Sequence, residues 1–259
     1  MARILIFFCV FALNSNKAHA YWMTTKAPTL PPVTTEPTWE TKNLGGWMFS
    51  IMPNSVVRFR SAALSNVTGI TLCLRALTEK NGFSDNTLLL TFGENAAVCI
   101  RDYSVYYQLQ VAGSFTNFYI RSMVPVQTSA SLWRSRCLTW DSSSGMAQLW
   151  TDGMMSIRKG LSRGTVFSGK AELIFQIEGQ VSNIYMWDSV LSIRQLHKYL
   201  YHHSVPSQGS VLDWTQMEFS ASGYVVLEPA YPKRLHAGPA KRNKKKRMKT
   251  LKKRLRQEV

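Results

Sequence analysis

Residues 132–153 read LWRSRCLTWDSSSGMAQLWTDG, and this stretch decides the fold class. Cys137 and Trp140 lie in a strand-like run. A Ser/Gly turn follows, and a second such run with Trp150 ends at Asp152-Gly153. Asp-Gly between two alternating runs predicts a tight hairpin turn. The aromatic and aliphatic residues can fill the interior of a sheet, and Cys137 is placed to hold that sheet by a disulfide. The stretch favours a secreted, β-rich recognition domain.

The same pattern recurs on either side of this stretch. A two-residue apolar period returns over residues 105–111, 147–157 and 173–177, as half-buried strands require. Many short strands at this spacing predict an all-β fold, a two-sheet antiparallel jelly-roll sandwich, over residues 46–232. One helix is predicted, because Ser192-Ile193-Arg194-Gln195 has the capping-box pattern and an apolar stripe follows it at Leu196, Tyr199 and Leu200. This helix should pack on one of the two sheets.

The chain has 259 residues, of which 45% are hydrophobic, so it can bury one large core. Its first residues, 1–20, have the pattern of a secretory signal peptide. Arg3 precedes an apolar run over 4–13, and Ala18-His19-Ala20 offers small residues for cleavage. The apolar run is too short to span a bilayer, and no later run is longer. We therefore expect a secreted, extracellular protein without a transmembrane segment. The alternative is an uncleaved anchor.

Two segments differ in composition from the predicted sandwich. Residues 21–45 hold seven Thr and four Pro, which predicts a linker or an O-glycosylated stalk. Residues 233–259 hold thirteen basic residues and one acid, so this tail supplies most of the net charge of +16. A solvated, disordered tail is one interpretation. A basic amphipathic helix that binds anionic glycans or phospholipid surfaces is the other. The candidate anionic-ligand residues are Lys244, Lys245, Lys246, Arg247, Lys252, Lys253 and Arg254. We expect no specific nucleic-acid partner.

Cysteine usage and one sequon fit an exported chain. Cys9 leaves with the predicted signal, so Cys73, Cys99 and Cys137 remain and one of them is left over from any disulfide. The residues alone leave three pairings open. Asn66-Val67-Thr68 is an N-glycosylation sequon, which should lie on the surface.

Four ordered motifs resemble the pentraxin family. Its signature reads His-x-Cys-x-Ser/Thr-Trp-x-Ser/Thr, and residues 137–142 match it from the cysteine onward, with Ser135 in place of the histidine. Gly145, Trp150 and Asp152-Gly153 continue the match. The other motifs are Arg158–Leu161, Met186–Ser192 and Val211–Trp214. The resemblance covers roughly residues 47–230.

The resemblance implies a fold, a disulfide and a cofactor. Pentraxins have a two-sheet, lectin-like jelly roll with one helix, and the pattern implies a disulfide between Cys73 and Cys137. Cys99 has no counterpart in it. The family also implies a homo-oligomeric ring, with five copies in the usual form. It further implies Ca²⁺ as cofactor, through which pentraxins bind phosphocholine or phosphoethanolamine.

The departures from the family concern calcium. Pentraxins hold two calcium ions with a Gln-Glu-Gln-Asp stretch and an acidic loop. Here Gln176 is followed almost at once by Glu178 and Gly179, so most of that loop is missing. Weak candidate ligands are Gln176, Glu178 and the pair Glu94-Asn95, for which Asp85-Asn86 is an alternative match. Calcium takes six to eight oxygen ligands, and this set is too small and too weakly charged. We expect calcium dependence to be weakened or lost.

Enzyme function is not expected. None of the five histidines lies in the predicted strands, which leaves no triad-like arrangement. The strands carry isolated acids, whereas a glycosidase needs two carboxylates close together. The sequence therefore predicts a secreted, non-catalytic, pentraxin-like binding protein of the innate-immune type. The alternative is an extracellular adhesion domain that binds anionic glycans or membranes through its basic tail.

Overall fold

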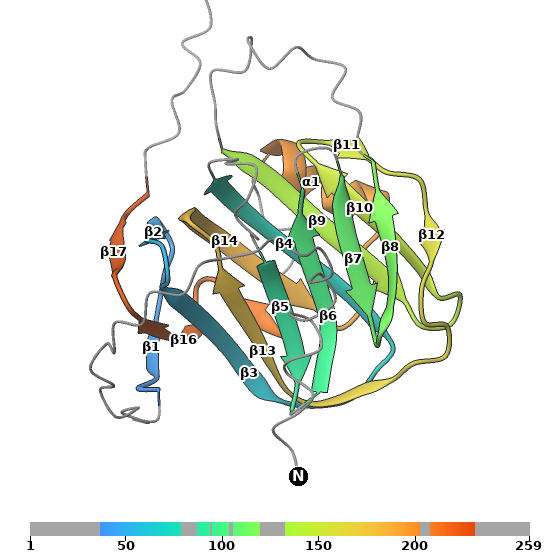
Figure 1. Ribbon diagram of the computed structural model, residues 1–259, viewed down its shortest axis with the longest axis horizontal. Helices are drawn as coiled ribbons and strands as arrows, with labels where there is room; N and C mark the ends of the chain where they lie inside the picture. Colours follow the sequence, from blue (N-terminus) through green and yellow to red (C-terminus); the bar gives the residue numbers. More distant parts are fainter. Residues whose placement is uncertain are drawn as a thin grey trace, which may run out of the picture. The chain divides into compact units, whose positions relative to one another are not determined.

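The computed structural model of the protein describes residues 37–78, 87–93, 95–103, 106–119, 133–202 and 208–230. Those up to residue 229 belong to one compact unit, a sandwich of two sheets (Figure 1). The strands of the first sheet, sheet A, are in spatial order β1 (Glu40–Lys42), β16 (Met217–Ser222), β3 (Val56–Val67), β13 (Phe167–Gln176), β5 (Thr87–Phe92), β6 (Asn95–Asp102), β7 (Tyr107–Val111) and β8 (Ser114–Phe118).

Sheet B is the second layer. Its strands are in spatial order β11 (Met154–Met155), β10 (Met146–Thr151), β9 (Arg134–Asp141), β4 (Gly69–Thr78), β14 (Gly179–Trp187), β2 (Trp47–Ile51) and β17 (Val225–Pro229). Two short strands join it, β12 (Lys159–Gly160) beside β10 and β15 (Leu212–Asp213) beside β14. Neighbouring strands in both sheets pair antiparallel, which confirms the predicted all-β sandwich.

Large side chains from both sheets fill the space between the layers. Phe59 of β3 packs edge-on against Phe49 of β2 and Phe175 of β13, with ring centroids 5.5 and 5.7 Å apart. Trp140 is fully buried, and its indole nitrogen donates to the carbonyl of Leu161 at 2.9 Å, so its polar atom is satisfied. The apolar residues that alternate over 109–111, 147–149 and 173–177 are buried and therefore mark the interior face of their strands.

The predicted Asp-Gly hairpin forms between β10 and β11. Asp152 and Gly153 both have positive φ, 49° and 83°, as the tight turn requires. The Asp152 carboxylate also accepts the backbone N–H of Ser135 at 2.8 Å, which ties the turn to β9. The second strand is shorter than predicted. It ends at Met155, and the side chain of Ile157 is 73% exposed.

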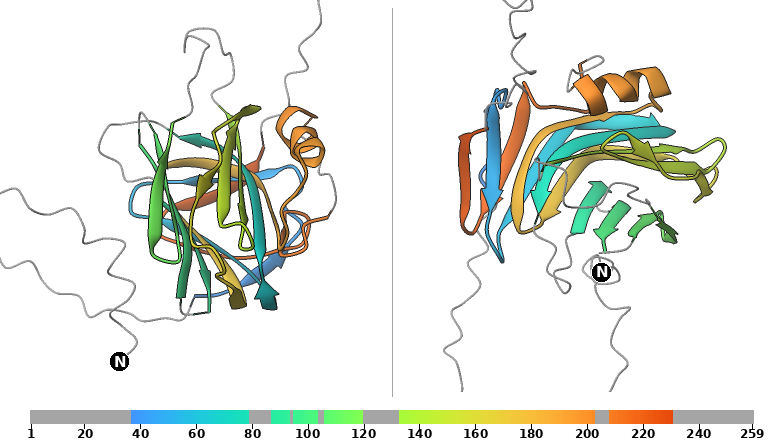
Figure 2. Two further views of the ribbon diagram at one scale, coloured as in Figure 1. Left: turned by 90° about the vertical axis from the view of Figure 1, so that its right-hand side faces the viewer. Right: turned by 90° about the horizontal axis from the view of Figure 1, so that it is seen from above.

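The helix α1 (Ile193–His202) begins as the capping box predicts. Gln195 accepts the backbone N–H of Ser192 at 2.9 Å, and Ser192 Oγ accepts the N–H of Gln195 at 3.4 Å. The helix lies on the outer face of sheet B (Figure 2), where the three stripe residues are buried. Tyr199 donates from its hydroxyl to the carbonyl of Asn183 in β14 at 2.6 Å. Within the described part of the chain, no helix is long and apolar enough to cross a membrane.

The folded unit begins earlier than the predicted boundary at residue 46. Strand β1 pairs with β16, with Glu40 opposite Phe219 and Lys42 opposite Met217. Leu44 is fully buried, and its N–H donates to the carbonyl of Trp214 at 2.9 Å. The end of the segment predicted as a linker is therefore part of sheet A. The predicted signal peptide and the basic tail lie outside the described residues.

Candidate functional site

The connection between β13 and β14 lies where the resemblance implies an acidic calcium loop. Strand β13 of sheet A ends at Gln176 and β14 of sheet B starts at Gly179, so Ile177 and Glu178 alone cross between the sheets. Of these two residues, Ile177 is buried and Glu178 is exposed. Gly179 has a φ of 142°, and a Cβ there would overlap the carbonyl oxygen of Leu77. We call this connection the two-residue link.

Among the candidate calcium ligands that the structure describes, Asn95 lies apart from Gln176 and Glu178. Gln176 pairs with Thr87, at the start of β5. Asn95 pairs instead with Phe92 at the end of β5, level with Ala171 of β13. Asn95 and Gln176 are therefore separated by five residues along the strand direction, which is about 17 Å. Glu94 and the alternative pair Asp85-Asn86 lie outside the described residues. Over the described ranges, no three His, Cys, Asp or Glu side chains form a group that could hold a metal ion.

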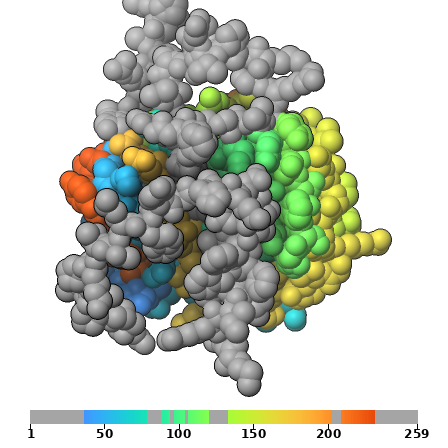
Figure 3. Space-filling view, in the orientation of Figure 1, coloured from blue at the N-terminus to red at the C-terminus, as the bar shows by residue number. Residues whose placement is uncertain are grey.

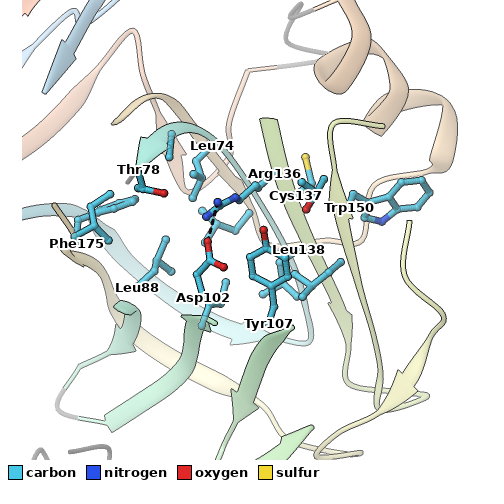
Figure 4. A pocket seen from close by; sticks show the side chains of 16 residues that line it. Leu74, Thr78, Leu88, Asp102, Tyr107, Arg136, Cys137, Leu138, Trp150 and Phe175 are labelled. Carbon is cyan, nitrogen blue, oxygen red and sulfur yellow. Dashed lines mark ion pairs between the residues drawn. The ribbon is translucent and has the colours of Figure 1, made fainter. Parts of the chain in front are cut away.

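A cavity of about 60 Å³ lies between the sheets at the end marked by the two-residue link (Figure 4). Its walls are mainly aliphatic and come from both layers. They include Leu72, Leu74, Ala76, Leu88, Ile100, Leu138, Leu149, Phe175 and Ile177. Asp102 is the single carboxylate in its lining, so the cavity offers no pair of carboxylates for glycoside chemistry.

An ion pair crosses this cavity from one sheet to the other. Arg136 of β9 lies 2.8 Å from Asp102 of β6, measured from Nη2 to Oδ2. The two side chains are 20% and 5% exposed. The Arg136 guanidinium also lies 5.3 Å from the ring centroid of Tyr107, a cation–π distance. In a low-dielectric interior each charge is stable only because its partner is present. The pair therefore joins the two sheets across this cavity.

Sequence reasoning did not find this pair, although one signal was present. Arg136, Leu138 and Trp140 alternate along β9 and share its interior face. A charged residue at an interior position indicates a buried partner. Asp102 could not be named as that partner, because it comes from the other sheet.

The disulfide implied by the resemblance is confirmed. Cys73 of β4 and Cys137 of β9 are directly opposite each other in sheet B and are bonded. Cys99 is buried in β6 of sheet A and takes no part in this bond. Asn66 is exposed at the end of β3, and Thr68 of the same sequon is exposed as well. A glycan on Asn66 would therefore meet no buried surface.

A surface ion pair in sheet A makes stability depend on pH. Arg60 of β3 and Glu218 of β16 are cross-strand partners and are hydrogen-bonded. This hydrogen bond, with the charge of Arg60, lowers the pKa of Glu218 below its ordinary value of 4.5. A lowered folded-state pKa stabilises the fold above the unfolded-state pKa, and this contribution disappears as the pH falls through the folded-state pKa.

We therefore expect Glu218→Gln to lower the melting temperature at neutral pH and to have progressively less effect below about pH 4.5. Thermal unfolding followed between neutral pH and about pH 3 checks this. Glu178→Gln, which changes an exposed glutamate in the two-residue link, is the control. If the melting temperature of Glu218→Gln stayed below that of the unchanged protein by the same amount down to about pH 3, the ion pair would not be the source of the pH dependence.

Comparison with known proteins agrees with these features. The model of the pentaxin family matches residues 53–229. Serum amyloid P-component of Rattus norvegicus is 26% identical over 176 residues, which cover 61% of this chain and 73% of the relative. C-reactive protein of Sus scrofa is 28% identical over 192 residues, which cover 68% of this chain and 82% of the relative.

Two solved structures share the fold. A native heptameric SAP-like pentraxin from Limulus polyphemus superposes with a TM-score of 0.60 at 17% identity, over 73% of this chain and 97% of that one. The full extracellular region of zebrafish Gpr126/Adgrg6 has a TM-score of 0.55 at 16% identity, over 73% of this chain and 27% of that one. The family match covers most of the chain and nearly all of the described sandwich. The chain therefore belongs to the pentaxin (pentraxin) family.

Proposed function

We propose that this protein is a secreted, non-catalytic recognition protein of the innate-immune type, whose ligand binding has weakened or lost its dependence on calcium. Family membership supports the recognition role. The two-residue link carries the calcium part of the proposal, because it occupies the place of the family's acidic loop. An ordinary signal sequence at residues 1–20 supports secretion.

The number of oxygen ligands decides the calcium part. A tight calcium site needs six to eight oxygens, several of them from carboxylates. The two-residue link contributes one carboxylate, Glu178, and the amide of Gln176 precedes it. Asn95 lies level with Ala171, halfway along β13, as described above. A pair of calcium ions held at the usual place in the family would therefore lack most of its ligands.

Calorimetric titration of the full chain with calcium chloride tests this proposal. We expect no saturable uptake in the micromolar range. A pentraxin that retains the acidic loop is the positive control, and Glu178→Gln in this chain should give the same trace as the unchanged protein. Uptake of two calcium ions per chain with micromolar affinity would refute the proposal. So would binding to immobilised phosphocholine that EGTA abolishes.

Three further features belong to this proposal. Copies of the chain associate into a homo-oligomer, which the heptameric Limulus relative supports. Asn66 carries an N-linked glycan, which its exposure allows. The basic tail contacts anionic glycans or phospholipid, which its concentration of Lys and Arg supports.

A further inference from the structure

The outer face of sheet A over β6, β7 and β8 has an ordered arrangement of side chains. Leu109, Val111 and Phe118 are fully buried, so they mark the interior face of these strands. Because side chains alternate along a strand, the residues between them point outward. Figure 3 shows β7 and β8 in green at the surface, beside the yellow atoms of the segment that contains β12.

Three tyrosines form a row across the end of these strands. Tyr103 and Tyr106 flank the β6–β7 turn, where the N–H of Tyr103 donates to the carbonyl of Tyr106 at 2.9 Å. Their ring centroids are 4.7 Å apart, with an interplanar angle of 31°. Tyr119 follows β8, is 61% exposed, and lies 5.6 Å from Tyr106. We call these residues the tyrosine row.

A polar row lies next to the tyrosine row, one pleat further along the sheet. Arg101 is opposite Gln108, and Gln108 is opposite Asn117. Arg101 Nη1 donates to Gln108 Oε1 at 2.9 Å, and Gln108 Nε2 donates to Asn117 Oδ1 at 3.4 Å. These contacts hold a guanidinium and two amides in a line beside the rings.

A second cation lies at the end of both rows. Lys159 of β12 donates from Nζ to the backbone carbonyl of Asn117 at 2.6 Å, and its Nζ lies 5.8 Å from the Tyr119 ring. The described outward positions of β6, β7 and β8 carry no carboxylate. Those that are at least partly exposed are Arg101, Tyr103, Tyr106, Gln108, Gln110, Phe115, Asn117 and Tyr119, whereas Cys99 is buried. The surface is therefore aromatic, rich in hydrogen-bonding groups and positively charged.

We propose that this surface binds an acidic saccharide, a sugar ring that carries a carboxylate. The apolar C–H face of a pyranose ring packs on exposed aromatic rings, and amide and guanidinium groups bond its hydroxyls. Arg101 and Lys159 provide charges opposite to that of a carboxylate. The same two cations repel a quaternary ammonium group, which an aromatic surface would otherwise attract. Tyrosine side chains are rigid, so little conformational entropy is lost on binding.

The inference rests on the proposed recognition function and names its ligand class, but it needs neither calcium nor the basic tail. The probe is a hyaluronan tetrasaccharide, and chitotetraose is a neutral ligand of the same length. Binding to the full chain is measured by calorimetry in EGTA and again in calcium. We expect the acidic tetrasaccharide to bind equally in both buffers and the neutral one to bind about tenfold more weakly.

Substitutions in the tyrosine row distinguish sugar binding by this surface from sugar binding by the basic tail, because every variant keeps the tail. Tyr106→Ala and Tyr119→Ala should each weaken binding by about tenfold, whereas Tyr106→Phe keeps the ring and should bind as the unchanged protein does. Tyr224→Ala is the matched control, since Tyr224 is 68% exposed at the β16–β17 turn. Equal melting temperatures among these variants show that each is folded.

Each remaining outcome has one meaning. Binding that survives both alanine substitutions overturns the site, because the tail or another surface then holds the sugar. Equal affinity for the two tetrasaccharides overturns the acidic class of ligand. Binding that requires calcium contradicts the proposed function itself. The absence of binding to either probe overturns the inference and leaves the calcium titration as the test of the proposed function.

Discussion

Substitution of both Cys73 and Cys137 by alanine is expected to lower the free energy of unfolding by about 4 kcal/mol. The disulfide closes a segment with a sequence separation of 64 residues, and its loss returns that conformational freedom to the unfolded chain. The two residues join adjacent strands of sheet B, β4 and β9, which lie in the middle of that sheet. Equilibrium urea unfolding, followed by tryptophan fluorescence, measures the difference.

The control separates loss of the disulfide from loss of buried sulfur. Cys99→Ala removes a buried thiol from sheet A without opening a loop, so its effect should be about 1–2 kcal/mol. Should the double variant fail to fold, mild reduction of the unchanged protein gives the same comparison. A reduced protein whose unfolding midpoint equals that of the oxidised protein would contradict the prediction.

Asp102→Asn is expected to destabilise the protein by about 3 kcal/mol, because it leaves the Arg136 charge between the sheets without a carboxylate. This is the low end of the range for buried pairs, since 20% of the Arg136 side chain remains exposed. Combining Asp102→Leu with Arg136→Met should recover most of the loss, because the surrounding cavity wall is aliphatic. Urea unfolding of Asp102→Leu, of Arg136→Met and of the double variant gives the coupling energy between the two residues.

A partly exposed ion pair within sheet A is the matched control for this inter-sheet pair. Arg58 and Glu172 lie 3.5 Å apart on the outer face of sheet A, and both side chains are about one-third exposed. Arg58→Met should therefore change stability by no more than about 1 kcal/mol. Were Asp102→Asn no more destabilising than Arg58→Met, the inter-sheet pair would have no special role in stability.

Local signals in the sequence predicted the elements that depend on neighbouring residues. Asp152-Gly153 places two positive φ angles side by side, and Ser192 with Gln195 satisfies the helix N-terminus, so both elements form as predicted. Strand β1 was missed for the opposite reason. Its partner, β16, lies far along the chain, and a segment rich in Thr and Pro has the composition of a linker.

The site was harder to predict because strand direction decides which residues meet. The candidate Asn95 follows a turn after β5, and the antiparallel course of β5 carries it away from Gln176. The Arg136–Asp102 pair forms only when the two sheets pack face to face, and no local sequence pattern determines how they pack. The tyrosine row forms only when three strands pair in the right register. The alternation of β6 and β7 could have indicated the turn that Tyr103 and Tyr106 flank, but not the position of Tyr119.

The glycine that closes the two-residue link limits how this molecule could regain a divalent ion. Gly179 begins β14 directly after the crossing, in a backbone conformation that disfavours side chains and against the carbonyl of Leu77. Exchanging single residues there for acids would add charge but no length of chain to wrap around an ion. Only the insertion of a whole acidic segment between Gln176 and Gly179 would supply both.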